Sequence, residues 1–177
     1  MSGYKLGVDQ VNVVWDDMKF PATRQRQGAT QKPDFDYTNM GLLFPQNDAT
    51  EISYLIGQFS HAYKEGSDIS PHLHFIQDSA STPTFKMDYR WYNNEDDISA
   101  LGWTTLTAST FAFTWTSGDL VQIASFPDIS GTGKKISSMI EIKLYRDDNV
   151  VTGDVLLKEF DVHYQIDSNG SRQEFIK

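Results

Sequence analysis

Three of the four histidines lie in two short segments where their spacing could create a metal site. His72 and His74 are in the stretch SPHLHF, and His163 is in FDVHYQ, two residues after Asp161. Residues i and i+2 of a β-strand point to the same face, so each pair would project together. Imidazole and carboxylate groups are good ligands for divalent zinc, iron, nickel or manganese. If the two strands are neighbours, the sequence predicts a candidate metal site made of His72, His74, Asp161 and His163.

The first of these segments is similar to the motif of the cupins, which are metal-binding β-barrels. In that motif a glycine is followed by five residues, then by His-x-His, then by an acid, and Gly66, His72, His74 and Asp78 follow this order. The resemblance implies a metal-binding enzyme that uses His72, His74 and His163, with the ligands pointing into the barrel. Asp78 stands where cupins have glutamate, and no Pro-x-Gly precedes His163. The cupin-like enzyme is therefore an alternative interpretation.

Apolar residues alternate with the candidate ligands on both segments, and they predict which way the ligands point. The alternating apolar side chains are expected to face the core, which leaves the histidines on the polar outer face of a sheet. Three interpretations stay open there: surface or interface histidines, a metal between subunits, and a metal within one chain. The residues expected to face inward are Leu73, Phe75, Phe160, Val162 and Tyr164.

Other chemistry has weaker support in the sequence. It contains no G-x-S-x-G, no P-loop and no H-E-x-x-H, so we expect no enzyme activity and no cofactor apart from the candidate divalent metal. Asp147 and Asp148 are interpreted as a solvated turn, because neighbours on a strand would point apart. Carbohydrate binding is another alternative, because aromatic rings offer broad apolar surfaces with a polar edge. A sugar-stacking platform could come from Trp91, Tyr92, Trp103, Phe111, Phe113 and Trp115.

Period-2 alternation runs through most of the chain and predicts the strands that position these residues. No apolar stripe has the helical period. A row of short strands without interleaved helices predicts an all-β fold. We expect an antiparallel β-sandwich that is jelly-roll-like, with an immunoglobulin-like sandwich as the alternative. The residues expected in its core are Ile52, Tyr54, Ile56, Phe85, Met87, Tyr89, Trp91, Ile140, Ile142, Leu144, Phe160, Val162 and Tyr164.

Length, composition and charge limit the classes of protein and partner. The 177 residues, of which 39% are hydrophobic, contain no linker and are predicted to form a single domain, 1–177. The net charge of −9 would repel phosphate backbones, so we expect no nucleic-acid partner. No apolar run approaches the roughly 18 residues of a membrane-spanning helix, so we expect no membrane partner. Without cysteine, disulfides and zinc–thiolate sites are excluded.

Residues 1–36 are predicted to include an N-terminal arm. Its apolar part is followed by the polar stretch RQRQGATQKPDFD, residues 24–36. Long irregular segments often contact a partner. We therefore expect part of the arm to pack on a neighbouring subunit of a homo-oligomer, for which a trimer is one candidate state. The candidate interface residues are Trp15, Phe20, Arg24 and Arg26.

Several long segments resemble a family of proteins from tailed phages, prophages and marine metagenomes. The resemblance extends from about Val13 to Phe175. It implies a virion-associated structural protein of the head, tail or fibre that acts through oligomer assembly with other virion proteins. Such a protein would be found in the virion and, during assembly, in the host cytoplasm. The segments are VVWDDMKFPATRQRQG, DYTNMGLLFPQNDATE, KEGSDISPHLHF, FKMDYRWYNN, IKLYRDDN and FDVHYQIDSNGSRQEF.

Overall fold

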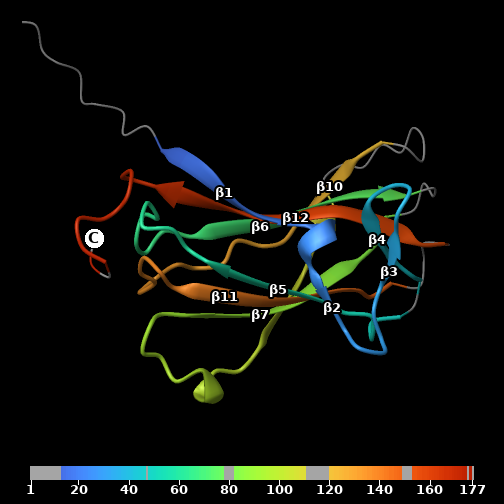
Figure 1. The fold of residues 1–177 in the computed structure, drawn as a ribbon, viewed down its shortest axis with the longest axis horizontal. Helices are drawn as coiled ribbons and strands as arrows, with labels where there is room; N and C mark the ends of the chain where they lie inside the picture. The colour runs from blue at the N-terminus through green and yellow to red at the C-terminus, as the bar shows by residue number, and fades with distance from the viewer. Residues whose placement is uncertain are drawn as a thin grey trace, which may run out of the picture.

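The computed structural model describes residues 13–46, 48–77, 82–110, 120–148, 153–174 and 176. They form two antiparallel sheets packed as a sandwich, which confirms the predicted fold class (Figure 1). Sheet A has the strand order β3-β4-β12-β6-β10-β9, with β1 also paired to β12, and sheet B has the order β2-β5-β11-β7-β8. The strands are β1 (Val14–Pro21), β2 (Arg26–Gln27), β3 (Asp34–Asp36), β4 (Gly41–Phe44), β5 (Ser53–Gln58), β6 (Ile69–Gln77), β7 (Phe85–Tyr92), β8 (Thr104–Thr107), β9 (Ser109–Thr110), β10 (Gln122–Ser125), β11 (Met139–Arg146) and β12 (Val155–Ile166).

Helical structure in the described ranges is limited to two 3₁₀ turns, η1 (Ala22–Arg24) and η2 (Ile98–Ala100). The side chain of Asp97 caps η2 by accepting a hydrogen bond from the Ser99 N–H. This backbone donor has no carbonyl partner within so short a turn. Within the same ranges, no helix has the length and apolar character needed to span a membrane.

Strand β12 organises sheet A because it pairs along both of its edges. One edge faces β6, from the Val155–Gln77 pair to the Tyr164–Ile69 pair. The other edge pairs first with β4 and then with β1 (Figure 1), and the β12–β6 ladder shifts its register between Leu157 and Glu159. The outward side chains of β1, β12 and β6 therefore lie side by side on the outer face of sheet A.

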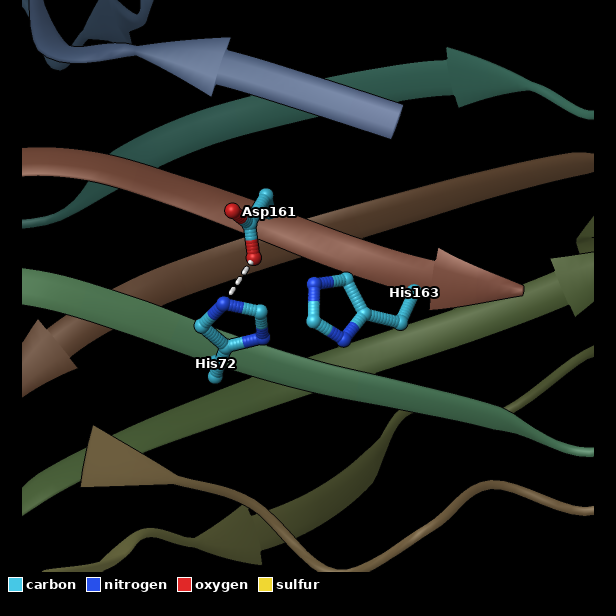
Figure 2. A group of neighbouring side chains, drawn as sticks. All are labelled: His72, Asp161 and His163. Carbon is cyan, nitrogen blue, oxygen red and sulfur yellow. Dashed lines mark ion pairs between the residues drawn. The ribbon is translucent and has the colours of Figure 1, made fainter. Parts of the chain in front are cut away.

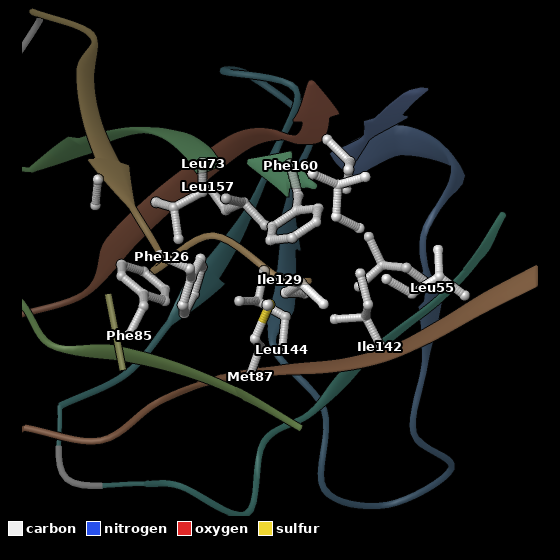
Figure 3. Close-up of a cluster of buried hydrophobic side chains, with 14 of the residues drawn as sticks. Leu55, Leu73, Phe85, Met87, Phe126, Ile129, Ile142, Leu144, Leu157 and Phe160 are labelled. Atoms are coloured by element: carbon white, nitrogen blue, oxygen red, sulfur yellow. The ribbon is translucent and has the colours of Figure 1, made fainter. Parts of the chain in front are cut away.

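The core lies between the sheets and uses the apolar half of each alternating strand. Leu73, Leu157 and Phe160 of sheet A are fully buried, and Figure 3 shows them on the opposite side of the cluster from Met87 and Leu144 of sheet B. Buried apolar area of this kind is the main source of stability in a sandwich. Two predicted core residues, Ile52 and Tyr89, are partly buried. Those confirmed as buried are Phe85, Met87, Trp91, Ile140, Ile142, Leu144, Phe160, Val162 and Tyr164.

Strand β5 faces the opposite way from the prediction. Tyr54 and Ile56 are 40% and 58% exposed, whereas Ser53 and Leu55 are buried. This segment carries apolar residues on both faces, so its alternation does not decide which face is inside. Pairing with β11 decides it, because Leu55 lies opposite Ile142 in the core. The prediction that Tyr54 and Ile56 are core residues was wrong.

A buried ion pair lies where the sequence predicted a solvated turn. Arg146 is fully buried, and its Nε and Nη2 atoms donate to the two carboxylate oxygens of Asp148 at 2.8 and 3.1 Å. Its Nη1 atom donates to the backbone carbonyls of Phe44 and Gly153. The solvated-turn interpretation was therefore wrong for Asp148. The prediction failed because the buried Arg146, two residues earlier in the chain, pairs with the Asp148 carboxylate in place of water.

The described part of the predicted arm, residues 13–36, lies on the sandwich of its own chain. Strand β1 pairs with β12, β2 with β5, and β3 with β4. Residues 1–12 lie outside the described residues. Contact of the arm with a neighbouring subunit stays a prediction.

Candidate functional site

The position of β12 between β1 and β6 gathers five side chains on the outer face of sheet A. Asp161 of β12 is the cross-strand partner of His72 on β6. His163, two residues further along β12, is the partner of Asp17 on β1. His74 follows His72 at the same two-residue spacing, which keeps it on the same face. We call these residues the histidine cluster: His72, His74, His163, Asp161 and Asp17.

Short distances connect the members of the histidine cluster. Nε2 of His72 lies 2.7 Å from Oδ1 of Asp161, and Nε2 of His74 lies 3.5 Å from the other carboxylate oxygen (Figure 2 shows the first pair). Nε2 of His163 lies 3.0 Å from Oδ1 of Asp17. The ring centroids of His72 and His163 are 4.3 Å apart. All four sequence-predicted metal residues are thus brought together, with Asp161 at their centre.

The cluster points outward as predicted but is more buried than a polar outer face would be. Leu73 and Phe75 face the core, which confirms the predicted alternation. Yet His72 and Asp161 are only 8% and 4% exposed, while the side chain of His163 is 43% exposed. Both residues lie on strands that are paired along both edges, Asp161 between β1 and β6 and His72 between β12 and β10. They are therefore not ordinary surface side chains.

Two electrostatic features follow from this burial. Among the described residues, no donor is aligned for a hydrogen bond with Oδ1 of Asp161, although the His72 ring is close to it. Burial lowers the pKa of His72, but the Asp161 carboxylate, the backbone at Ser70 and the charge of Asp17 outweigh it. The pKa of His72 therefore lies above its ordinary value.

An open groove of about 530 Å³ borders the cluster on the side of β10. His72 and His163 form part of its wall, with Ile123 and Ser125 of β10 opposite, but His74 does not line it. The cupin-like alternative placed these ligands inside a barrel. The structure instead has them on an outer face, where the groove gives solvent access to two of the three rings.

Asp17 is the member of the cluster that the sequence analysis missed. It comes from the segment that was interpreted as an arm, and nothing in the spacing of VVWDDMKF indicates pairing with FDVHYQ. The register between β1 and β12 places it beside His163. Only long-range strand pairing could reveal this contact.

The outer face of sheet B carries a second group of polar and aromatic side chains. Arg90 of β7 and Glu141 of β11 form an ion pair at 2.6 Å. Above it, the Trp103 ring lies 3.8 Å from Lys143 Nζ and 4.7 Å from the Arg90 guanidinium carbon, measured to the ring centroid. Tyr54 is the cross-strand partner of Lys143. We call this group the aromatic face: Tyr54, Arg90, Trp103, Glu141 and Lys143.

The side chains of the aromatic face hold one another in place. Tyr92 Oη donates to Glu141 Oε1 at 2.8 Å, and the Arg90 guanidinium donates to the other carboxylate oxygen. Burial raises the pKa of Glu141, but these hydrogen bonds lower it more strongly, so the pKa lies below its ordinary value. Trp103 and Tyr54 remain 37% and 40% exposed. The result is a fixed polar surface with two accessible rings.

The aromatic residues predicted as a sugar platform separate into different environments. Trp91 is buried and its indole N–H donates to Ser138 Oγ, so it belongs to the core. Tyr92 is partly buried, and Trp103 is on the aromatic face. Tyr54 was not among the predicted platform residues, because it was expected in the core. The remaining predicted platform residues, Phe111, Phe113 and Trp115, lie outside the described residues.

The predicted interface residues also differ in exposure. Trp15 is 49% exposed near the start of β1. Phe20 is partly buried and packs against the core, with its ring centroid 6.1 Å from that of Phe160. Arg24 and Arg26 are exposed. Their role in an interface stays a prediction.

The sequence matches no protein-family profile and no curated protein. Three solved structures with similar folds are an isomalto-dextranase of Arthrobacter globiformis complexed with panose, a Clostridium thermocellum xylanase 10B fragment (CBM22-1 and GH10 modules) complexed with xylohexaose, and the CBM22-2 xylan-binding domain of Paenibacillus barcinonensis Xyn10C. Their sequence identities are 10%, 12% and 9%, and their TM-scores 0.46, 0.40 and 0.40. The alignments cover 82%, 90% and 83% of this chain, and 23%, 27% and 98% of the other chains. The chain thus spans about a quarter of the two enzyme structures, and no residue role is transferred from them.

Proposed function

We propose that this chain is a carbohydrate-binding β-sandwich domain whose ligand lies on the aromatic face of sheet B. The observation that carries the proposal is the pair of half-exposed rings beside one lysine. Lys143 contacts the Trp103 ring and has Tyr54 as its cross-strand partner. Tyr54 and Trp103 are thus both neighbours of Lys143 on this face. The apolar faces of pyranose rings pack against such side chains, which combine a large apolar surface with a polar edge.

The charged groups around the rings support recognition of hydroxyl groups. Arg90 presents several donors in a rigid fork, and Glu141 presents acceptors. Their mutual contact at 2.6 Å fixes both, so a ligand would not have to order them. Lys143 adds a third charged donor next to the rings. A few polar groups at fixed positions beside an apolar surface are typical of small-molecule sites.

The proposal is tested by calorimetric titration with panose and xylohexaose and by gel retardation in a panel of soluble polysaccharides. Trp103→Ala and Tyr54→Ala should each weaken binding by about tenfold or more, because removing an aromatic anchor commonly costs over 1 kcal/mol. Tyr37→Ala is the matched control, since Tyr37 is an aromatic residue that is 84% exposed and follows β3 of the other sheet. Retention of full affinity by both face variants, or no binding to any polysaccharide, contradicts the proposal.

A second proposal is assembly into a homo-oligomer, the role that the resemblance to virion proteins implies, and a separate observation supports the oligomer. Val13, Val14 and Trp15 are each about half exposed at the start of β1. In the described residues β1 pairs only with β12, so its other edge is open to a second copy of the chain. Light scattering should then show an oligomer, with a trimer as one candidate, that Trp15→Asp converts toward monomer. A wild-type protein that stays monomeric at micromolar concentration excludes this assembly.

A further inference from the structure

Three residues of the histidine cluster have ligand atoms close enough together to bind one metal ion after a small rearrangement. One ligand atom each from His72, Asp161 and His163 lies within 4.8 Å of the other two. Around a zinc ion with bonds of about 2.0–2.2 Å, tetrahedral ligand atoms are roughly 3.3 Å apart. The His72–Asp161 distance of 2.7 Å is shorter than this, so an ion between them would push the pair slightly apart. Small side-chain rotations would therefore bring all three atoms to coordination distance.

The chemistry of the three groups selects a class of ion. Two imidazoles and one carboxylate suit zinc and neighbouring divalent transition metals, whereas calcium and magnesium prefer oxygen ligands alone. Asp17 Oδ1 lies 3.0 Å from His163 Nε2. A carboxylate on one ring nitrogen commonly orients an imidazole that binds a metal through the other nitrogen, which for His163 is Nδ1. His74 lies 3.5 Å from Asp161 on its other side and is available as a further ligand or hydrogen-bond donor.

The burial of the Asp161 carboxylate at the centre of the cluster favours a cation at this position. Its side chain is 6% exposed, and its Oδ1 atom has no aligned hydrogen-bond donor among the described residues. A buried carboxylate oxygen without such a donor is costly. A protonated His72 alone would account for one close contact. It would not account for the His163 ring, which packs 4.3 Å from the His72 ring beside the same carboxylate.

The open groove gives access to two of the three ligands, His72 and His163, which form part of its wall. An ion could therefore enter without unfolding the sheet, and one coordination position facing the groove would remain for water or a further ligand. The net charge of −9 also favours the approach of a cation.

We propose that His72, Asp161 and His163 bind one divalent transition-metal ion of the zinc class per chain, on the outer face of sheet A. His72 comes from β6, and the other two ligands come from β12. Asp17 of β1 orients His163 as a positioning residue. The ion would cross-link the two central strands of sheet A and, through Asp17, hold the edge strand β1 against them. This site is on the opposite face from the proposed carbohydrate site and does not depend on it.

The experiment uses the full chain without a histidine tag, treated with EDTA and then titrated with Zn²⁺ alone. Calorimetry and elemental analysis should show one zinc per chain, and Co²⁺ should give the visible absorption of a nitrogen- and oxygen-ligated ion. His163→Gln should weaken zinc binding by about 100-fold or more, and its exposed side chain makes it the variant least expected to disturb folding. His72→Gln should do the same. Asp17→Asn should weaken binding by about 10- to 100-fold, the range seen for residues that orient a metal-bound histidine.

His61→Gln is the matched control, because His61 contacts Ser137 and Ser171 and is not a member of the cluster. It should bind zinc like the wild type. The proposal is overturned if the wild type takes up no stoichiometric zinc, or if folded His163→Gln, checked by circular dichroism, binds zinc as tightly as the wild type. One zinc per three chains would also overturn it, because that ratio indicates an ion shared between subunits. Magnesium alone should show no saturable binding at this site.

Discussion

The outer faces of sheets A and B both carry charged side chains, but they satisfy them in different ways. On sheet B, Arg90 and Glu141 pair at 2.6 Å while remaining 22% and 19% exposed, so protein and water share their solvation. On sheet A, the side chain of Asp161 is 6% exposed, and its Oδ1 atom lies 2.7 Å from the buried His72 ring. Exposed pairs lose little when a partner is removed, whereas buried groups depend on specific partners. The two faces therefore differ in how their charges are stabilised: by an ion pair that water also reaches on sheet B, and by buried neighbouring side chains on sheet A.

The largest expected effect is the stability lost when a buried ion pair is broken. Asp148→Ala should lower the free energy of unfolding by about 3–5 kcal/mol, because it leaves the fully buried guanidinium of Arg146 without its carboxylate. Its neighbour Asp147 has 42% of its side chain exposed and pairs with Lys86. Asp147→Ala should therefore cost less than about 1 kcal/mol. Urea denaturation of both variants measures the difference, and equal costs would break the comparison between buried and exposed charges.

Zinc binding to the histidine cluster on sheet A should raise the stability of the folded protein. At a free zinc concentration of about 100 times Kd, binding to the native state adds roughly 2.7 kcal/mol. For a chain of this size that corresponds to a rise in Tm of about 5–10 °C. Differential scanning fluorimetry should show this rise in the wild type and in Trp103→Ala. An unchanged Tm in His163→Gln would place the effect on the histidine cluster, whereas an equal rise would place it elsewhere.

Carbohydrate binding should depend on the aromatic face of sheet B and not on the histidine cluster of sheet A. Trp103→Ala should weaken carbohydrate binding by about tenfold, which corresponds to about 1.4 kcal/mol. His163→Gln should leave carbohydrate affinity within about twofold of the wild type, since it lies on the other sheet. Calorimetry of both variants with the same oligosaccharide tests this. Loss of carbohydrate binding in His163→Gln would show that the two faces are not independent.

The smallest effect concerns the pH dependence of stability on sheet B. Burial raises the pKa of Glu141, but hydrogen bonds from Arg90 and Tyr92 lower it by more than burial raises it. The folded pKa therefore lies below the unfolded value. Its contribution to stability is therefore present above the unfolded pKa and is lost as pH falls through the folded pKa. Glu141→Gln should flatten this acidic part of the stability curve by less than about 1 kcal/mol. An unchanged curve between about pH 5 and 3 would show that solvent screens the pair completely.

Several features were predictable because they depend on local alternation. Phe85, Met87 and Trp91 alternate strictly with polar residues, and all three are buried as predicted. The outward direction of the histidines followed from the same rule. Strand β5 shows the limit of this reasoning, because Tyr54 and Ile56 compete with Leu55 for the inner face. Where both faces are apolar, only the paired strand decides the orientation.

The sequence by itself determined the all-β sandwich, most of its core and the grouping of His72 with His74 and of Asp161 with His163. These depend on spacing within one strand, which fixes the face of each side chain. The tertiary structure alone decided that β12 lies between β1 and β6, that Asp17 meets His163, and that Asp161 is buried. The reason is physical: pairing between strands far apart in the sequence and the desolvation of a carboxylate depend on the whole packed chain, which local periodicity does not encode.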